Sequence, residues 1–307
     1  MTILKALAIC ILTVFAAGAV NARETGVIAG VKVETFSSGQ NGPRPVVVIL
    51  SGSKGFAAPA YDGIARQFSG AGIDVYLAHL LTTDDLHQIN SLQGAKQRID
   101  YYQQRRKDWI GSTAKLLTAL GKRPEYHGRI GLLGISLGAE SAALAISSRA
   151  PSNAVVLVDG APSKAFPSGK SPPFKLIWGS EDTVFTLTTG QRFVQEVNKA
   201  GGHATLNIFQ GGHDFFLKDT KQASEAYKTA IQFFKSELDG DSLGFGNVTS
   251  ANHQKLALAT GTPEAAPLRN REMGSDNQHP QTVCPLTAFP CSGPVNIAGS
   301  PLASAAP

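Results

Sequence analysis

The sequence predicts an α/β fold, with a mostly parallel sheet and helices on both of its faces. Two observations favour this class. Short β-branched apolar runs alternate with amphipathic segments, and several runs are apolar at nearly every position, as in strands buried on both faces. One of these runs also leads into a glycine-flanked serine and then an alanine-rich segment, which is the order strand, tight turn, helix. We expect a single domain over residues 23–238.

Seven apolar runs are predicted as strands. They are Val27–Phe36, Val46–Leu50, Ile73–Ala78, Ile130–Leu133, Ala154–Val158, Phe174–Trp178 and Ala204–Phe209. The segments between them carry helix signals. The longest predicted helix covers about residues 95–120, where helical spacing places on one face Ile99, Tyr102, Trp109, Thr113, Leu116 and Leu120. Further helices are predicted near residues 59–70, 139–148, 193–200 and 227–238.

The first 22 residues have the features of a secretory signal. Lys5 gives a positive start, residues 6–20 are uncharged and largely apolar, and Val20-Asn-Ala22 offers the small residues that signal peptidase recognises. The apolar run is too short for a comfortable membrane span. We therefore predict cleavage after Ala22, export to the periplasm or beyond, and no stable membrane insertion afterwards. A retained N-terminal anchor is the alternative.

Residues 239–307 differ in composition from the rest of the chain. They hold eight of the 17 prolines and only two aromatic residues. Such a segment buries too little apolar surface to offset the entropy lost on ordering it, so a largely disordered tail is predicted. If Cys10 leaves with the signal, Cys284 and Cys291 are the remaining cysteines and could pair in an oxidising compartment.

The charge of the chain excludes one class of function. The formal net charge is +5, and loss of Lys5 with the signal lowers it to +4. No block of basic residues with interleaved aromatics is present, so nucleic-acid binding is not expected. No set of four convergent ligands is evident around the two tail cysteines, so a zinc site is not expected either.

The segment Gly134-Ile-Ser136-Leu-Gly138 joins a predicted strand to a predicted helix. Glycine allows close backbone approaches that a Cβ would block, so this turn can push the serine oxygen clear of the sheet as a nucleophile elbow does. The motif alone is common by chance, but the order strand, turn, helix makes it specific. A serine hydroxyl attacks well only when a base removes its proton and a carboxylate orients that base.

Candidates for the carboxylate and the base follow later predicted strands. Asp182 follows the sixth predicted strand and His213 follows the seventh, so both should lie at the same sheet edge as Ser136. Glu181, beside the first candidate, and Asp159, after the fifth predicted strand, are the alternative acids. The other histidines are expected to be structural.

Three motifs together resemble a known family. "GISLGAE", "WGSEDTVF" and "GGHDFF", in this order and spacing, are similar to the dienelactone hydrolase branch of the α/β-hydrolase superfamily, over about residues 27–238. The resemblance implies that Ser136 is the nucleophile, that His213 is the general base and acid, and that Asp182 orients His213. The dienelactone hydrolases proper carry cysteine at the nucleophile position, so the resemblance implies ester hydrolysis in general without implying the dienelactone substrate in particular.

Acyl transfer also needs donors for the negative charge that develops on the carbonyl oxygen. The backbone N–H of Leu137, immediately after the serine, should supply one donor. The second should come from the glycine-containing loop after Val46–Leu50, with the N–H of Ser53 or Lys54 as candidates. The Lys54 side chain could also attract an anionic substrate, and Glu140 is expected to make a structural contact near the site.

These observations predict an exported serine hydrolase that cleaves a carboxylic ester or related acyl bond of a small molecule through an acyl-serine intermediate. That chemistry needs no cofactor. A thioesterase or an acyltransferase uses the same machinery and remains an alternative. The alternative from another class is a non-catalytic, envelope-associated binding protein that keeps the hydrolase fold.

Overall fold

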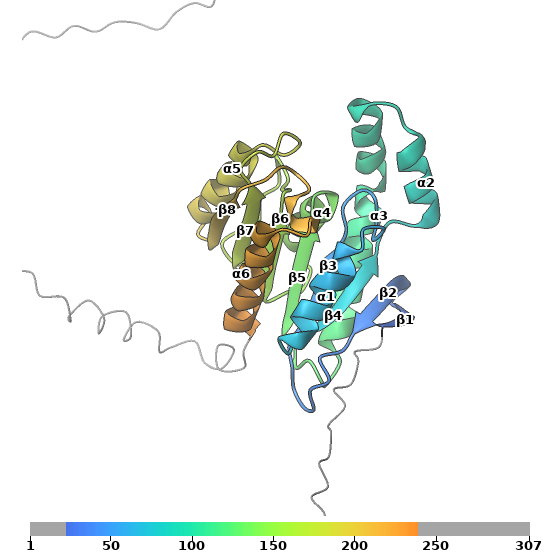
Figure 1. Cartoon of the computed structure of the whole chain (residues 1–307), viewed down its shortest axis with the longest axis vertical. Coiled ribbons are helices and arrows are strands. Elements are labelled where there is room, and N and C mark those ends of the chain that lie inside the picture. Colours follow the sequence, from blue (N-terminus) through green and yellow to red (C-terminus); the bar gives the residue numbers. More distant parts are fainter. Residues whose placement is uncertain (1–22, 239–307) are drawn as a thin grey trace, which may run out of the picture. The chain divides into compact units, whose positions relative to one another are not determined.

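The computed structural model describes residues 23–238, which form one eight-stranded sheet flanked by helices (Figure 1). The sequence-based predictions for residues 1–22 and 239–307, including a pair between Cys284 and Cys291, lie outside the described residues. The strands are β1 (Arg23–Ile28), β2 (Val31–Phe36), β3 (Val46–Leu50), β4 (Asp74–His79), β5 (Ile130–Ile135), β6 (Ala154–Val158), β7 (Phe174–Gly179) and β8 (Ala204–Phe209).

The sheet has the order β1-β2-β4-β3-β5-β6-β7-β8. From β4 to β8 every neighbouring pair is parallel, whereas β2 pairs antiparallel with both β1 and β4. The parallel strands therefore end at a common edge, where side chains after β5, β7 and β8 can meet. The prediction of one strand over Val27–Phe36 was wrong. This segment is most of a hairpin, because Ala29 and Gly30 both adopt positive φ (50° and 83°) and reverse the chain between β1 and β2.

The helices cover the two faces of the sheet as predicted. α1 (Ala60–Gly70) and α6 (Lys221–Leu238) pack on one face, and α3 (Ala95–Gly121), α4 (Leu137–Ser147) and α5 (Leu187–Lys199) pack on the other (Figure 1). Residues of β3 alternate between the two layers, with Val47 on the α1 side and Val48 on the α3 side. Within residues 23–238, no helix has the length and apolarity that a membrane span would require.

The start of α3 differs from its prediction. Ile99 was expected on the covered face, but its side chain is 51% exposed, whereas Trp109 and the later members of that face are buried. The start of α3 extends beyond the strands, so the sheet does not cover it there; it lies instead beside a helix that the apolar pattern did not predict, α2 (Thr83–Ser91) (Figure 1). The signal for α2 was a capping box, in which Thr82 Oγ1 accepts the Asp85 N–H and the Asp85 carboxylate accepts the Thr82 N–H.

Candidate active site

Ser136 lies at the sharp turn between β5 and α4. Its φ is 55° and its ψ is −116°, a conformation that costs free energy for a residue with a Cβ. The turn is held by the Ser136 N–H, which donates to the carbonyl of Val158 at the end of β6 at 2.8 Å. The strand, turn and helix of the elbow therefore form as the sequence predicted.

The two glycines of the elbow are required by close backbone approaches. A Cβ on Gly134 would lie 2.4 Å from the carbonyl oxygen of Gly138. A Cβ on Gly138 would lie 2.4 Å from the carbonyl oxygen of Leu50, where β3 ends. Neither contact could be relieved by a side-chain rotation, so the turn can be this tight only with glycine at both positions.

The structure brings Ser136, His213 and Asp182 together from three strand ends. Ser136 Oγ lies 2.9 Å from His213 Nε2, and His213 Nδ1 lies 2.9 Å from Asp182 Oδ2. An ionised carboxylate can only accept, so Nδ1 carries a proton and Nε2 is free to accept the hydroxyl proton of Ser136. The side chain of Asp182 is fully buried, whereas that of His213 is 19% exposed. The outer side of the imidazole stacks on Phe185, with ring centroids 5.9 Å apart.

The Asp182 carboxylate is held in one orientation. Its Oδ1 accepts the N–H groups of Val184 and Phe185 at 2.8 and 2.9 Å, which leaves Oδ2 for His213. The loop is fixed in turn by β7, because the indole N–H of Trp178 donates to the Phe185 carbonyl at 2.8 Å. Glu181, the neighbouring alternative acid, is exposed to solvent. Of these two acids, only Asp182 bonds His213.

The loop after β3 approaches Ser136 closely. A Cβ built on Gly52 would lie 3.5 Å from the Cβ of Ser136. The Gly52 N–H already donates to the Tyr61 hydroxyl oxygen at 3.1 Å, which leaves the amides of Ser53 and Lys54 as candidates for the second oxyanion donor. Leu137 is the first residue of α4, where N–H groups lack an acceptor within the helix.

Asp159, the other alternative acid, lies close to the side chains of Asp182 and His213. Its carboxyl oxygen and the ligand atoms of Asp182 and His213 lie within 4.8 Å of one another, and Asp159 is fully buried. One ligand atom from each of Asp159, Asp182 and His213 is close enough to the others to bind a common metal ion. However, His213 Nδ1 is already hydrogen-bonded to Asp182. We therefore interpret the group as a hydrogen-bonded acid–base pair, Asp182 and His213, with Asp159 as a second acid beside it.

The two charged residues near the elbow that the sequence singled out differ in their surroundings. Glu140, one turn into α4, accepts a hydrogen bond from Arg106 of α3 at 2.7 Å, and burial raises the pKa of its carboxyl. This is the structural contact that was predicted. The side chain of Lys54 is exposed on the loop.

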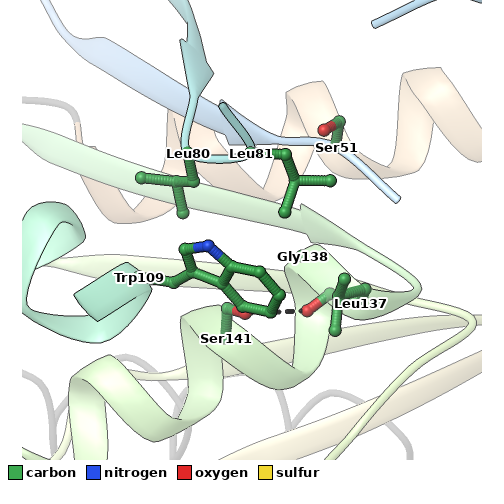
Figure 2. Close-up of a pocket in the computed structure, with 7 residues that line it drawn as sticks. All are labelled: Ser51, Leu80, Leu81, Trp109, Leu137, Gly138 and Ser141. Carbon is green, nitrogen blue, oxygen red and sulfur yellow. Dashed lines mark hydrogen bonds between the residues drawn. The ribbon is translucent and has the colours of Figure 1, made fainter. Parts of the chain in front are cut away.

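A narrow apolar pocket lies beside Leu137, between α3, α4 and the loops after β3 and β4. Figure 2 shows the Trp109 indole below Leu80 and Leu81 and next to the start of α4. The pocket is lined by Ser51, Leu80, Leu81, Trp109, Leu137 and Ser141, together with Gly138. Ser141 Oγ donates to the Leu137 carbonyl at 2.9 Å and so holds the first turn of α4 in place.

Sequence reasoning missed the residue that positions Trp109. Asp85 of α2 is buried, and its carboxylate accepts hydrogen bonds from Tyr101, Arg105 and Trp109 of α3 at 2.6, 2.7 and 3.4 Å. These bonds, with the Arg105 guanidinium the strongest among them, hold the pKa of the Asp85 carboxyl well below its usual range. The capping box at Thr82 was the only sequence signal that could have pointed to this carboxylate.

The strand order, the elbow after β5 and the acid and histidine after β7 and β8 define an α/β-hydrolase. Within that class, residues 32–238 match the dienelactone hydrolase family, and the chain belongs to this family. No curated protein matches the chain in sequence.

Solved structures of similar proteins agree with the fold. A dienelactone hydrolase-like promiscuous phosphotriesterase from metagenomic libraries is 18% identical, with a TM-score of 0.57 over 67% of this chain and 92% of its own. The dienelactone hydrolase of Anabaena variabilis is also 18% identical, with a TM-score of 0.54 over 71% of this chain and 97% of its own. Esterase 2 of Thermogutta terrifontis, phosphonylated by cyclosarin, is 16% identical, with a TM-score of 0.50 over 70% and 94%.

Proposed function

We propose that this chain is an exported serine hydrolase that cleaves a carboxylic ester or related acyl bond of a small molecule through an acyl-serine intermediate. The observation that carries the proposal is the continuous hydrogen-bonded chain from Ser136 Oγ through His213 to Asp182, with both distances at 2.9 Å. A serine retained only for packing would not need a histidine in its correct tautomer and a buried carboxylate behind it.

In the first half of the reaction, His213 Nε2 takes the hydroxyl proton of Ser136 while Oγ attacks the acyl carbon. The Asp182 carboxylate stabilises the imidazolium that forms and keeps its ring in place. His213 then returns the proton to the leaving alcohol, which leaves the acyl group on Ser136. In the second half, His213 activates a water molecule, which attacks the acyl-serine and releases the acid.

The tetrahedral intermediates of both halves carry negative charge on the former carbonyl oxygen. We assign the Leu137 N–H as one donor to that oxygen and the N–H of Ser53 or Lys54 as the other. Loss of one such donor typically costs about 2.7–4 kcal/mol of transition-state stabilisation. The positive end of the α4 dipole points in the same direction and adds to this stabilisation.

The structural relatives point to the reagent that tests this proposal. One is described as a promiscuous phosphotriesterase and another as an esterase phosphonylated by cyclosarin. If Ser136 is activated in the same way, an organophosphonate should form a covalent adduct with it. The stable adduct traps the nucleophile and so identifies it directly.

The test is labelling of the mature protein with a fluorophosphonate probe, followed by turnover of p-nitrophenyl esters. We expect Ser136→Ala and His213→Ala each to abolish labelling and turnover. Ser148→Ala, at the far end of α4, and His203→Ala, at an exposed loop position, serve as matched controls and should keep both activities. A folded natural chain that neither labels nor hydrolyses any ester would favour the binding-protein alternative instead.

Export is tested separately, because the catalytic domain would work in any compartment. Expression of the full chain with its first 22 residues should give a protein outside the cytoplasm whose N-terminus, read by mass spectrometry, is Arg23. Recovery of intact Met1 from the cytoplasm would contradict this part of the proposal and leave the chemistry untouched.

A further inference from the structure

Asp159 has an environment that packing alone does not explain. It follows β6 directly and is fully buried, with 0% of its surface exposed. Its φ of 46° is unfavourable for a residue with a Cβ. Its Oδ1 accepts the Gly179 N–H at 2.8 Å, at the point where β7 leads into the Asp182 loop. Its Oδ2 is buried and has no hydrogen-bond partner among residues 23–238.

The carboxyl of Asp159 lies beside the acid–base pair of the proposed active site. Its ligand oxygen is within 4.8 Å of those of both His213 and Asp182, so it lies less than about 2 Å beyond hydrogen-bond distance of the imidazole. The charged groups around it are Asp182 of the β7 loop and Asp214 of the β8 loop, both of which disfavour a second negative charge here. The backbone strain and the unpartnered oxygen therefore occur where a second buried acid lies next to the histidine.

We propose that Asp159 is a reserve positioning acid, able to hold His213 Nδ1–H in place of Asp182. The inference rests on the proposed function, because it assigns a role within the same acid–base pair. In the natural chain Asp182 makes the bond to Nδ1, and Asp159 stays neutral beside it. Burial, with a smaller contribution from the two neighbouring aspartates, raises the pKa of the Asp159 carboxyl to about 8.

Removal of Asp182 would change this balance. The nearest negative charge disappears, which lowers the free energy of ionising Asp159. The Asp159 carboxyl then loses its proton to solvent and, as a carboxylate, accepts the Nδ1–H of His213. Nε2 remains unprotonated and still takes the proton of Ser136 Oγ during attack.

The test compares Asp182→Ala with the double variant Asp182→Ala/Asp159→Asn. Loss of the orienting acid costs about 10⁴-fold in kcat in a triad that has no second acid. With a reserve acid, we expect kcat/KM for p-nitrophenyl acetate to fall about 10²-fold in Asp182→Ala and about 10⁴-fold in the double variant. Asp159→Asn should thus cost far more activity in the Asp182→Ala chain than in the natural chain.

Asp182→Ala/Asp214→Asn is the matched control, since Asp214 is a second acid near His213 but is exposed. It should keep the activity of Asp182→Ala. Equal activity of Asp182→Ala and its Asp159→Asn double variant would overturn the proposal, as would an equal loss on changing Asp214. Failure of the natural chain to react with a fluorophosphonate would instead refute the proposed function.

A second measurement covers the case in which the double variant does not fold. In proton NMR spectra, an Nδ1–H bonded to a carboxylate gives a strongly deshielded resonance. We expect that resonance to persist in Asp182→Ala, shifted in position, because Asp159 has taken the bond. Its absence from the folded single variant would overturn the proposal, and a merely structural role for Asp159 would not produce it.

Discussion

The hydroxyl oxygen of Tyr61 accepts the backbone N–H of Gly52 at 3.1 Å, which ties α1 to the loop that faces Ser136. Tyr61 is buried, and burial raises the pKa of its phenol to about 12, so the hydroxyl stays neutral throughout the working pH range. Because Gly52 directly precedes the two candidate oxyanion donors, this bond sets where their N–H groups point.

Tyr61→Phe is therefore expected to lower kcat about 10-fold, with little change in KM. The substitution leaves the Gly52 N–H without its partner, a loss of about 1–3 kcal/mol that the loop can relieve by shifting. Steady-state kinetics on p-nitrophenyl esters would show the effect. Tyr126→Phe is the control, because Tyr126 bonds Asp74 at the opposite end of the parallel strands, and it should keep kcat. An unchanged kcat for Tyr61→Phe would rule out this positioning role.

The pocket beside Leu137 should limit the acyl group. Trp109→Leu removes the indole that closes it (Figure 2) and keeps the position apolar. Since one methylene in an apolar pocket is worth about 1–3 kcal/mol, we expect the ratio of kcat/KM for p-nitrophenyl butyrate over acetate to rise about 10-fold. A ratio equal to that of the natural chain would show that the acyl group binds elsewhere.

Asp85→Asn should loosen α2 and the start of α3. Removal of one partner from a buried ion pair typically costs about 3 kcal/mol or more, here through Arg105. The low pKa of Asp85 sets the pH window. Its contribution to stability is present above the normal aspartate pKa and is lost as the pH falls through the depressed value. Urea unfolding should therefore show a large loss at neutral pH that shrinks only in strong acid.

The control for this prediction is Asp84→Asn, which changes an exposed acid one residue earlier on α2. It should unfold at nearly the same urea concentration as the natural chain. Equal stability of the Asp84 and Asp85 variants at pH 7 would mean that the buried carboxylate does not hold the two helices together.

Asp159→Asn should stabilise the fold, increasingly so as the pH rises. A carboxyl whose pKa is about 8 when folded and about 4 when unfolded contributes stability that is fully present below the unfolded pKa and is lost as the pH rises through the folded pKa. Between those values the natural chain loses up to ~1.4 kcal/mol per pH unit relative to the amide, which can still accept the Gly179 N–H. Urea unfolding at pH 5, 7 and 9 measures the difference. A difference that does not vary with pH would show that Asp159 is ionised in the folded protein.

Much of the fold follows from local pattern. Continuous apolar runs such as Val46–Leu50 and Ala154–Val158 match β3 and β6 residue for residue, because strands buried on both faces are apolar at nearly every position. The hairpin of β1 and β2 was missed, since the turn at Ala29-Gly30 has only one strong turn residue. α2 was missed because it is too polar for an apolar pattern to reveal.

The sequence by itself determined the elbow, the class of fold and which serine, aspartate and histidine would follow strands of the parallel sheet. These properties depend on glycines at fixed spacing and on apolar runs, both of which are local. Only the tertiary structure decided that Asp182 rather than Glu181 bonds His213, that Tyr61 holds Gly52, and that Asp159 lies beside the pair. Each of these depends on which side chains meet across strands and loops that are far apart in the chain, and no local pattern specifies such contacts.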